Sequence, residues 1–107
     1  MCIVRDAIEE MMENGKRPKD IEFVCWEDSL YFTWNEFASI MQNRNSGDIL
    51  YNKNESNEYT TLSADRLRIV GKDWWLEREE YDGSEWWEFR TFPQKPLEHG
   101  NPDFVRF

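Results

Sequence analysis

The chain lacks the residue combinations on which most metal sites and nucleophilic active sites depend. Its two cysteines, Cys2 and Cys25, form no closely spaced pair, and its one histidine, His99, lies among Pro and Gly residues. Structural metals and Cys–His nucleophiles need several such side chains at characteristic spacings. The five glycines are scattered and form no phosphate-binding loop. We therefore predict no metal, no cofactor and no catalytic residue from motifs of these kinds.

Long apolar runs are also missing. No segment approaches the roughly 20 apolar residues that a membrane-spanning helix requires. Residues 1–6 do not begin an apolar stretch followed by small residues, the pattern that marks a secretory signal. We therefore expect a cytoplasmic protein in a reducing compartment, with Cys25 in the core of a strand.

Basic residues are the scarcer charge. Lys and Arg together number 13 against 22 Asp and Glu, which gives a formal net charge of −9. Such a chain repels nucleic-acid phosphates and anionic membranes and attracts basic protein surfaces. The one basic cluster, at 16–19, is more typical of a solvated linker. We expect no direct binding to nucleic acid or membrane; the alternative is that the acidic charge serves solubility alone.

Aromatic residues, by contrast, are abundant. Six Trp, seven Phe and four Tyr make up 16% of the 107 residues. Each large ring buries much area, so a chain with only 39% hydrophobic residues can still build one core. We predict a single domain over residues 1–107, in which 43–66 form a long polar loop and 93–107 an irregular C-terminal tail.

The spacing of apolar residues predicts two helices and several strands. Val4, Ala7, Ile8 and Met11 recur at helical spacing, and Thr33-Trp34-Asn35-Glu36 forms a capping box before a second helix. The predicted helices span 3–13 and 34–42, and the predicted strands span 21–26, 30–32, 49–51, 59–62, 67–70, 74–80 and 85–92. These elements predict an α+β fold: an antiparallel sheet of four to six strands with two α-helices packed on one face.

Strand alternation divides the residues of 21–26 between two sides. Ile21, Phe23 and Cys25 share one side, because successive side chains of a strand point to opposite faces. The other side carries Glu22, Val24 and Trp26.

The dipeptide Asp82-Gly83 between two strand-like runs predicts a β-hairpin with a two-residue turn. In this register Tyr81 lies opposite Ser84, and the pairs behind the turn are Arg78–Trp87, Leu76–Phe89 and Trp74–Thr91. A three-residue loop is the alternative, but it would mix Glu and apolar side chains on both faces. The apolar face lets Arg78 lie over Trp87. The other face carries the candidate site residues, which are Trp75, Glu77, Glu79, Tyr81, Trp86, Glu88 and Arg90.

This mixed face suggests a protein-binding module, because Trp, Tyr and Arg concentrate binding energy in interfaces. Its acidic residues favour a basic partner, such as a nucleic-acid-binding host defence protein that a phage or mobile element inhibits. Three alternatives remain open. The face could bind a small molecule or carbohydrate, Glu77 and Glu88 could act as general acid and base, or Trp75 and Trp86 could be covered by the loop or the tail.

Two segments carry a resemblance to known sequences. The stretch 69–89, which includes Trp74-Trp75-Leu76-Glu77-Arg78-Glu79-Glu80-Tyr81-Asp82-Gly83-Ser84-Glu85-Trp86-Trp87-Glu88-Phe89, resembles a segment of small uncharacterised proteins of bacteria and their phages. The stretch Tyr31–Phe37 is similar to a strand–helix junction in the same group. The resemblance does not extend over 43–65. It implies a phage or mobile-element context and no particular activity.

Overall fold

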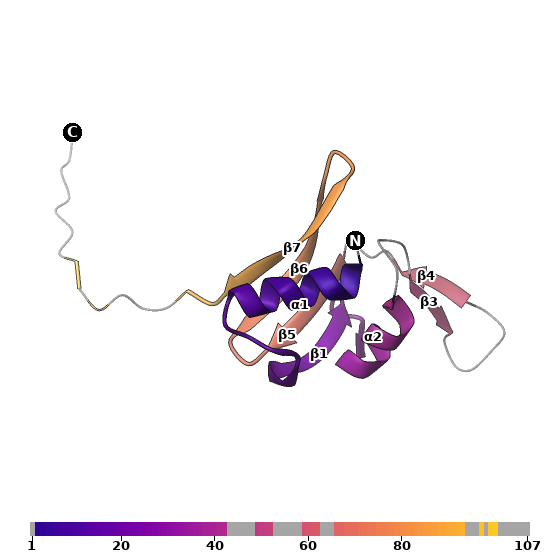
Figure 1. Ribbon diagram of the computed structural model, residues 1–107, viewed down its shortest axis with the longest axis horizontal. Coiled ribbons are helices and arrows are strands. Elements are labelled where there is room, and N and C mark those ends of the chain that lie inside the picture. Colours follow the sequence, from indigo (N-terminus) through magenta and orange to yellow (C-terminus); the bar gives the residue numbers. More distant parts are fainter. Residues whose placement is uncertain are drawn as a thin grey trace.

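The computed structural model describes residues 2–42, 49–52, 59–62, 66–93, 97, 99 and 100. Its main body is a five-stranded antiparallel sheet in the order β2-β1-β5-β6-β7, with α1 and α2 packed on one face (Figure 1). A separate two-stranded sheet pairs β3 with β4. The predicted α+β architecture is therefore confirmed. The elements are α1 (Ile3–Glu13), a 3-10 turn (Pro18–Asp20), β1 (Ile21–Trp26), β2 (Leu30–Phe32), α2 (Trp34–Met41), β3 (Ile49–Asn52), β4 (Tyr59–Leu62), β5 (Leu67–Gly71), β6 (Trp74–Tyr81) and β7 (Ser84–Thr91).

Helix α1 buries a stripe along one side. Ile3, Ala7 and Met11, spaced four residues apart, are fully buried, while Val4 and Ile8 pack against the edge of the core. The helix ends at Asn14 and Gly15, and Gly15 has a positive φ of 75° that suits glycine. Of the predicted stripe, Ala7 and Met11 are fully buried and Val4 and Ile8 only partly, while Ile3, which was expected to flank the stripe, is fully buried.

Helix α2 begins at the predicted capping box. The Thr33 hydroxyl accepts a hydrogen bond from the Glu36 amide at 3.1 Å, and the Thr33 amide donates to the Glu36 carboxylate at 2.9 Å. These hydrogen bonds lower the pKa of Glu36. Phe37 and Met41 are the buried residues of the helix, which ends one residue before the expected Gln42.

A bulge in β1 changes which residues share a face. Ile21 pairs with Gly71, but Phe23 pairs with Val70, so the extra residue Glu22 shifts the alternation. Ile21 consequently packs against the core, which corrects its predicted placement beside Phe23.

The predicted position of Cys25 in a strand core is also wrong. Cys25 is only half-buried, and its partners in the sheet are Tyr31 and Arg68, on the face away from the helices. The core position next to it in β1 belongs to Val24, which is fully buried.

The hairpin register is confirmed at every predicted pair. Tyr81 lies opposite Ser84, and the remaining pairs run without a break to Trp74–Thr91. Asp82 and Gly83 have positive φ angles of 51° and 81°, the backbone that a two-residue hairpin turn of this hand requires. As a result, the two adjacent indoles of β7 point to opposite faces.

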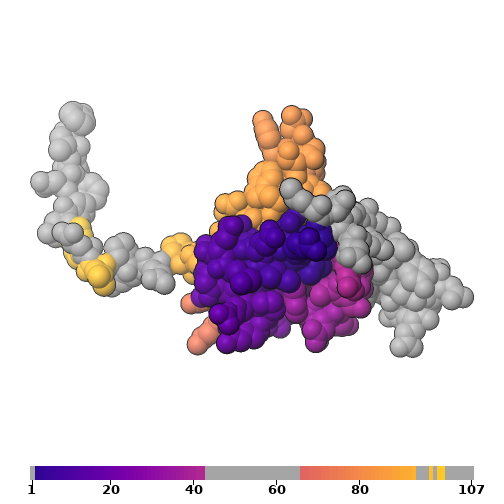
Figure 2. All heavy atoms as spheres, in the orientation of Figure 1, coloured from indigo at the N-terminus to yellow at the C-terminus, as the bar shows by residue number. Residues whose placement is uncertain are grey.

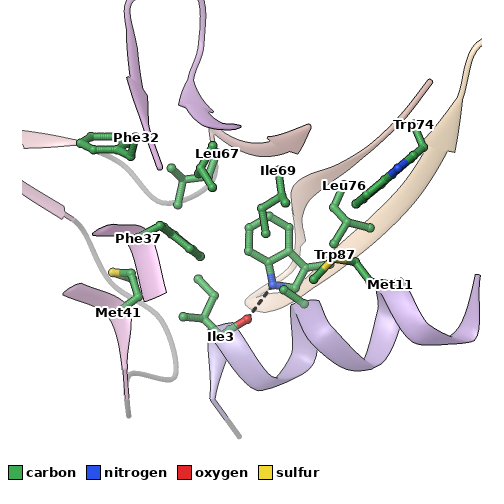
Figure 3. Close-up of a cluster of buried hydrophobic side chains, with 12 residues drawn as sticks. Ile3, Met11, Phe32, Phe37, Met41, Leu67, Ile69, Trp74, Leu76 and Trp87 are labelled. Carbon is green, nitrogen blue, oxygen red and sulfur yellow. Dashed lines mark hydrogen bonds between the residues drawn. The ribbon is translucent and has the colours of Figure 1, made fainter. Parts of the chain in front are cut away.

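The core gathers around Trp87, where both helices meet the sheet (Figure 3). Its indole N–H donates to the backbone carbonyl of Ile3 at 2.9 Å, and its ring meets Phe37 edge-on at 6.4 Å. Trp74, at the other end of the hairpin, stacks on Phe89 and fills the space above Gly71. A Cβ atom at Gly71 would lie 2.1 Å from the Trp74 ring, so only glycine fits there.

One charged residue, Arg78, lies within this core. Its guanidinium sits over the Trp87 ring at 5.2 Å, as predicted, and reaches Glu85 at 3.6 Å. The Nε and Nη1 atoms are buried without a hydrogen-bond partner, and burial lowers the pKa of the group. The planar guanidinium of Arg78 therefore covers the Trp87 ring at the edge of the core.

Within the described part of the chain, no helix is long and apolar enough to span a bilayer. The predicted short strands in 43–66 are present as β3 and β4. The rest of the predicted loop, and most of the predicted tail, lie outside the described residues.

The two adjacent tryptophans of β7 allow a matched test of this packing. Trp87→Phe removes the bond to Ile3 and part of a ring that is 4% exposed, so we expect a loss of about 1–3 kcal/mol in the free energy of unfolding. Trp86→Phe makes the same chemical change at a 40% exposed site and should cost less than about 0.5 kcal/mol. Urea unfolding followed by far-UV circular dichroism measures both. Equal losses in the two variants would contradict the assigned faces.

Candidate binding face

The face of the five-stranded sheet that points away from the helices, called the open face below, carries all seven predicted site residues. No described element packs over it. The strand register places Trp75, Glu77, Glu79 and Tyr81 of β6 beside Trp86, Glu88 and Arg90 of β7. The structure thus brings the predicted residues together, and it divides them into a central ion network and a projecting tip.

Glu77 is the centre of the ion network. Its carboxylate accepts a hydrogen bond from the Trp75 indole N–H at 2.7 Å and another from Arg90 Nε at 3.1 Å. Arg68 of β5 approaches the same carboxylate at 3.5 Å from the opposite side. Arg90 also donates to Glu79 at 3.2 Å. Two guanidinium groups therefore hold Glu77 in place.

These contacts determine the protonation of Glu77. Partial burial by itself would raise the pKa of its carboxyl group, but the Trp75 hydrogen bond and the charges of Arg90 and Arg68 outweigh it. The net effect is a lowered pKa, so Glu77 stays ionised. A general acid needs a raised pKa instead, so this shift does not favour Glu77 as a general acid.

The tip of the hairpin projects beyond the rest of the sheet (Figures 1 and 2). β5 pairs with β6 only as far as Glu77, so the hairpin residues beyond this point pair only with each other. Tyr81 is 76% exposed and Trp86 is 40% exposed, with the Trp86 indole donating to Glu88 at 3.0 Å. The segment 79–89 contains Glu79, Glu80, Asp82, Glu85 and Glu88 and no Lys or Arg. The tip is therefore an acidic projection with two accessible rings.

An apolar groove occupies the other end of the open face, and our sequence predictions did not include it. It encloses about 530 Å³, and the apolar side chains that line it include Phe23, Tyr31, Val70, Trp75 and Phe92. Trp75 forms its wall together with Phe92, whose ring centroid lies 5.1 Å away.

The groove also contains the thiol of Cys25 and has charged residues at its rim. Cys25 also lines it, and burial raises the pKa of this thiol, which keeps it protonated. Asp28 and Arg68 stand at the rim. The apolar alternation of β1 was a visible signal for this groove, but only the pairing of β1 with β5 and β2 brings Phe23 beside Tyr31 and Val70.

The described residues contain no group of three or more His, Cys, Asp or Glu side chains placed to hold a metal ion. Every carboxylate of the central network is paired with a guanidinium or an indole N–H. These groups offer ring contact, charge and hydrogen bonding to a ligand.

The lowered pKa of Glu77 predicts a pH-dependent contribution to stability. A carboxyl group whose pKa is lower in the folded state stabilises the fold above its unfolded pKa of about 4.3, and this stabilisation disappears as the pH falls through the folded value. We expect Glu77→Gln to unfold more easily than the wild type at pH 7, and we expect this difference to shrink as the pH falls from 5 to 3.

Glu88→Gln is the matched control, because Glu88 lies opposite Glu77 but holds no guanidinium. It should lose little stability at pH 7, since it removes one of two facing carboxylates. Thermal unfolding of the three proteins at pH 7, 5 and 3 provides the measurement. A Glu77→Gln deficit that persists unchanged at pH 3 would show that the ion network is not its cause.

Comparison with known proteins found no match: no protein-family model, no curated protein and no solved structure is significantly similar to this chain.

Proposed function

We propose that this chain is a non-enzymatic protein-interaction module that uses the open face to bind a basic protein. One observation carries the proposal: the helices cover a single face of the sheet, while the other face presents accessible aromatic rings next to an acidic projection. Large exposed apolar patches are rare on soluble monomers, and where they occur they often mark an interaction site.

The aromatic residues supply the contact area. Tyr31, Tyr81, Trp86 and Phe92 are among the exposed large hydrophobic residues, and all four belong to the open face or its margin. Trp and Tyr residues contribute strongly to binding because they bury much area with few rotatable bonds. The hydrogen bonds of Trp75 and Trp86 to neighbouring carboxylates restrict both indoles before a partner arrives.

The charges indicate the type of partner. Arg68 and Arg90 balance Glu77 and Glu79, and Arg78 reaches Glu85. Among the described residues, the hairpin carboxylates without a guanidinium partner are Glu80, Asp82 and Glu88, which lie at or near the tip. An acidic projection fits a basic concave surface, and the net charge of −9 would accelerate such an association at low salt. A nucleic-acid-binding protein has such a groove, so we propose this class of partner. The chain would then act as an inhibitor that a phage or mobile element uses against a host defence protein.

Trp75 and Trp86 have different roles in this proposal. Trp75 is half-buried, packs against the tilted ring of Phe92 and orients Glu77, so its removal should affect the fold as well as binding. Trp86 is at the tip and makes one exposed hydrogen bond. Trp86, together with Tyr81, therefore gives the cleaner test.

The experiment compares capture of a basic partner by the wild type and by the double variant Tyr81→Ala/Trp86→Ala. We expect the variant to lose capture while its free energy of unfolding falls by less than about 1 kcal/mol, because both rings are exposed. Ile40→Ala is the control, since Ile40 is exposed to a similar degree but lies on α2. Capture that survives the double variant would remove the tip from the proposal, and capture unaffected by salt would remove its electrostatic part.

The apolar groove supports a second candidate function, the binding of a small molecule or carbohydrate. Its volume of about 530 Å³ lies in the range of ligand sites, and Trp75 offers a ring on which a sugar or base could stack. Trp fluorescence titrated with a panel of saccharides and nucleotides tests this idea. A saturable change that Tyr31→Ala removes and Trp86→Ala preserves would favour it over protein binding at the tip.

A further inference from the structure

The outer edge of β7 suggests how a basic partner would be held. We propose that β7 accepts an extended, basic segment of the partner as a sixth strand of the sheet. This inference rests on the proposed function, because it specifies the partner and the mode of contact at the same surface.

β7 is a long edge strand. It is the last strand of the sheet and has eight residues, and within the described part of the chain it pairs on one side only, with β6. The pair Tyr81–Ser84 flanks a two-residue turn and is therefore hydrogen-bonded, and in an antiparallel ladder such pairs alternate with unbonded ones. The backbone groups of Glu85, Trp87, Phe89 and Thr91 consequently point outward from the sheet.

β7 carries charged side chains but lacks several other features that usually protect an edge strand. Such strands are typically short, bulged, or interrupted by Pro or Lys. β2, on the opposite edge, has three residues, whereas β7 pairs with β6 in an unbroken register and contains neither Pro nor Lys. Its one cation, Arg90, is held by Glu77 and Glu79 of β6. An added strand would therefore find a regular row of backbone donors and acceptors.

The charges around this edge select a basic occupant. Glu85 and Glu88 belong to β7 itself, and Glu10 of α1 lies close enough to Glu88 for the two charges to interact. Burial, Glu13 and Glu88 together raise the pKa of Glu10, despite a hydrogen bond from Asn14 that lowers it. A second copy of this acidic chain would bring the same carboxylates against each other, whereas a basic strand would neutralise them.

An added strand also has a defined side-chain pattern. Alternate residues would lie on the open face beside Trp86 and Glu88, and the others would lie on the helix side beside Phe89. Basic residues suit the first set and small apolar residues the second. A peptide of alternating Lys and Val, as long as β7, has this chemistry, and its Glu–Val counterpart is the control of opposite charge.

Amide hydrogen exchange, measured residue by residue on the full chain, reports the added strand directly. We expect the Lys–Val peptide to slow exchange of the outward amides of Glu85, Phe89 and Thr91 by about tenfold or more, and the Glu–Val peptide to leave them unchanged. The amides of Trp86 and Glu88 already bond to β6, so they are the internal reference.

A substitution at Thr91 isolates the backbone contribution. Thr91→Pro removes an outward N–H that bonds to no other strand, so the fold tolerates it, and Thr91→Val keeps that N–H while changing the side chain. We expect Thr91→Pro to bind the Lys–Val peptide about tenfold more weakly than Thr91→Val does.

The outcomes separate this inference from the proposed function. If the peptide shifts the Trp86 resonances but leaves the outward amides unprotected, strand addition is refuted and binding through the open face stands. If the amides become protected but Tyr81→Ala/Trp86→Ala binds equally well, the strand edge is the site and the aromatic tip is not. Protection that appears without peptide and increases with protein concentration would identify a second copy as the occupant and overturn the basic partner.

Discussion

The strand pairing that the Asp82-Gly83 turn imposes is the constraint on which the rest of the structure depends. Both residues adopt positive φ, so the turn has two residues and every later pair of the hairpin follows from it. A shift of one residue would exchange the two faces, bringing Trp86 into the core and Trp87 to solvent. The core contacts of Trp87 with Ile3 and Phe37, and the open position of Trp86, are two consequences of the same register.

The two faces of the sheet are stabilised by different interactions. The helix-covered face removes apolar area from water, with Val24, Ile69 and Leu76 fully buried across three neighbouring strands. The open face keeps its polar groups satisfied without a covering layer, because the indole N–H groups and the guanidinium groups bond to the carboxylates beside them. A surface organised in this way is ordered and still accessible, which is the state that a binding site needs.

Charge is distributed unevenly along the hairpin, and this asymmetry connects stability with the proposed binding. At the base, Arg68 and Arg90 stabilise Glu77 in its ionised form. Towards the tip, Arg78 reaches Glu85 and the Trp86 indole bonds Glu88, but among the described residues Glu80 and Asp82 have no ion-pair partner. Solvent or a bound basic partner would compensate these charges. The same residues that make the tip and the β7 edge unfavourable for self-association make them favourable for a basic chain.

The sequence alone was sufficient for everything that local chemistry controls. The capping box at Thr33, the hairpin register and the faces of β6 and β7 depend on neighbours close in the chain, and the structure has them as predicted. The helical spacing of apolar residues also located α1, although Ile3 is more deeply buried than Val4 and Ile8. Strand alternation counted from a turn is reliable as long as no bulge intervenes.

Only the tertiary structure decided the features that depend on strands distant in sequence. The bulge at Glu22 moved Ile21 to the core, and the pairing of β1 with β5 placed Cys25 on the open face. Neither effect leaves a signal within the sequence of β1, so neither could be predicted from it. The groove between Tyr31, Val70 and Trp75 exists because the strand order brings β2, β5 and β6 into one sheet. Alternation determines that a strand has two sides, but long-range packing chooses which side the helices cover.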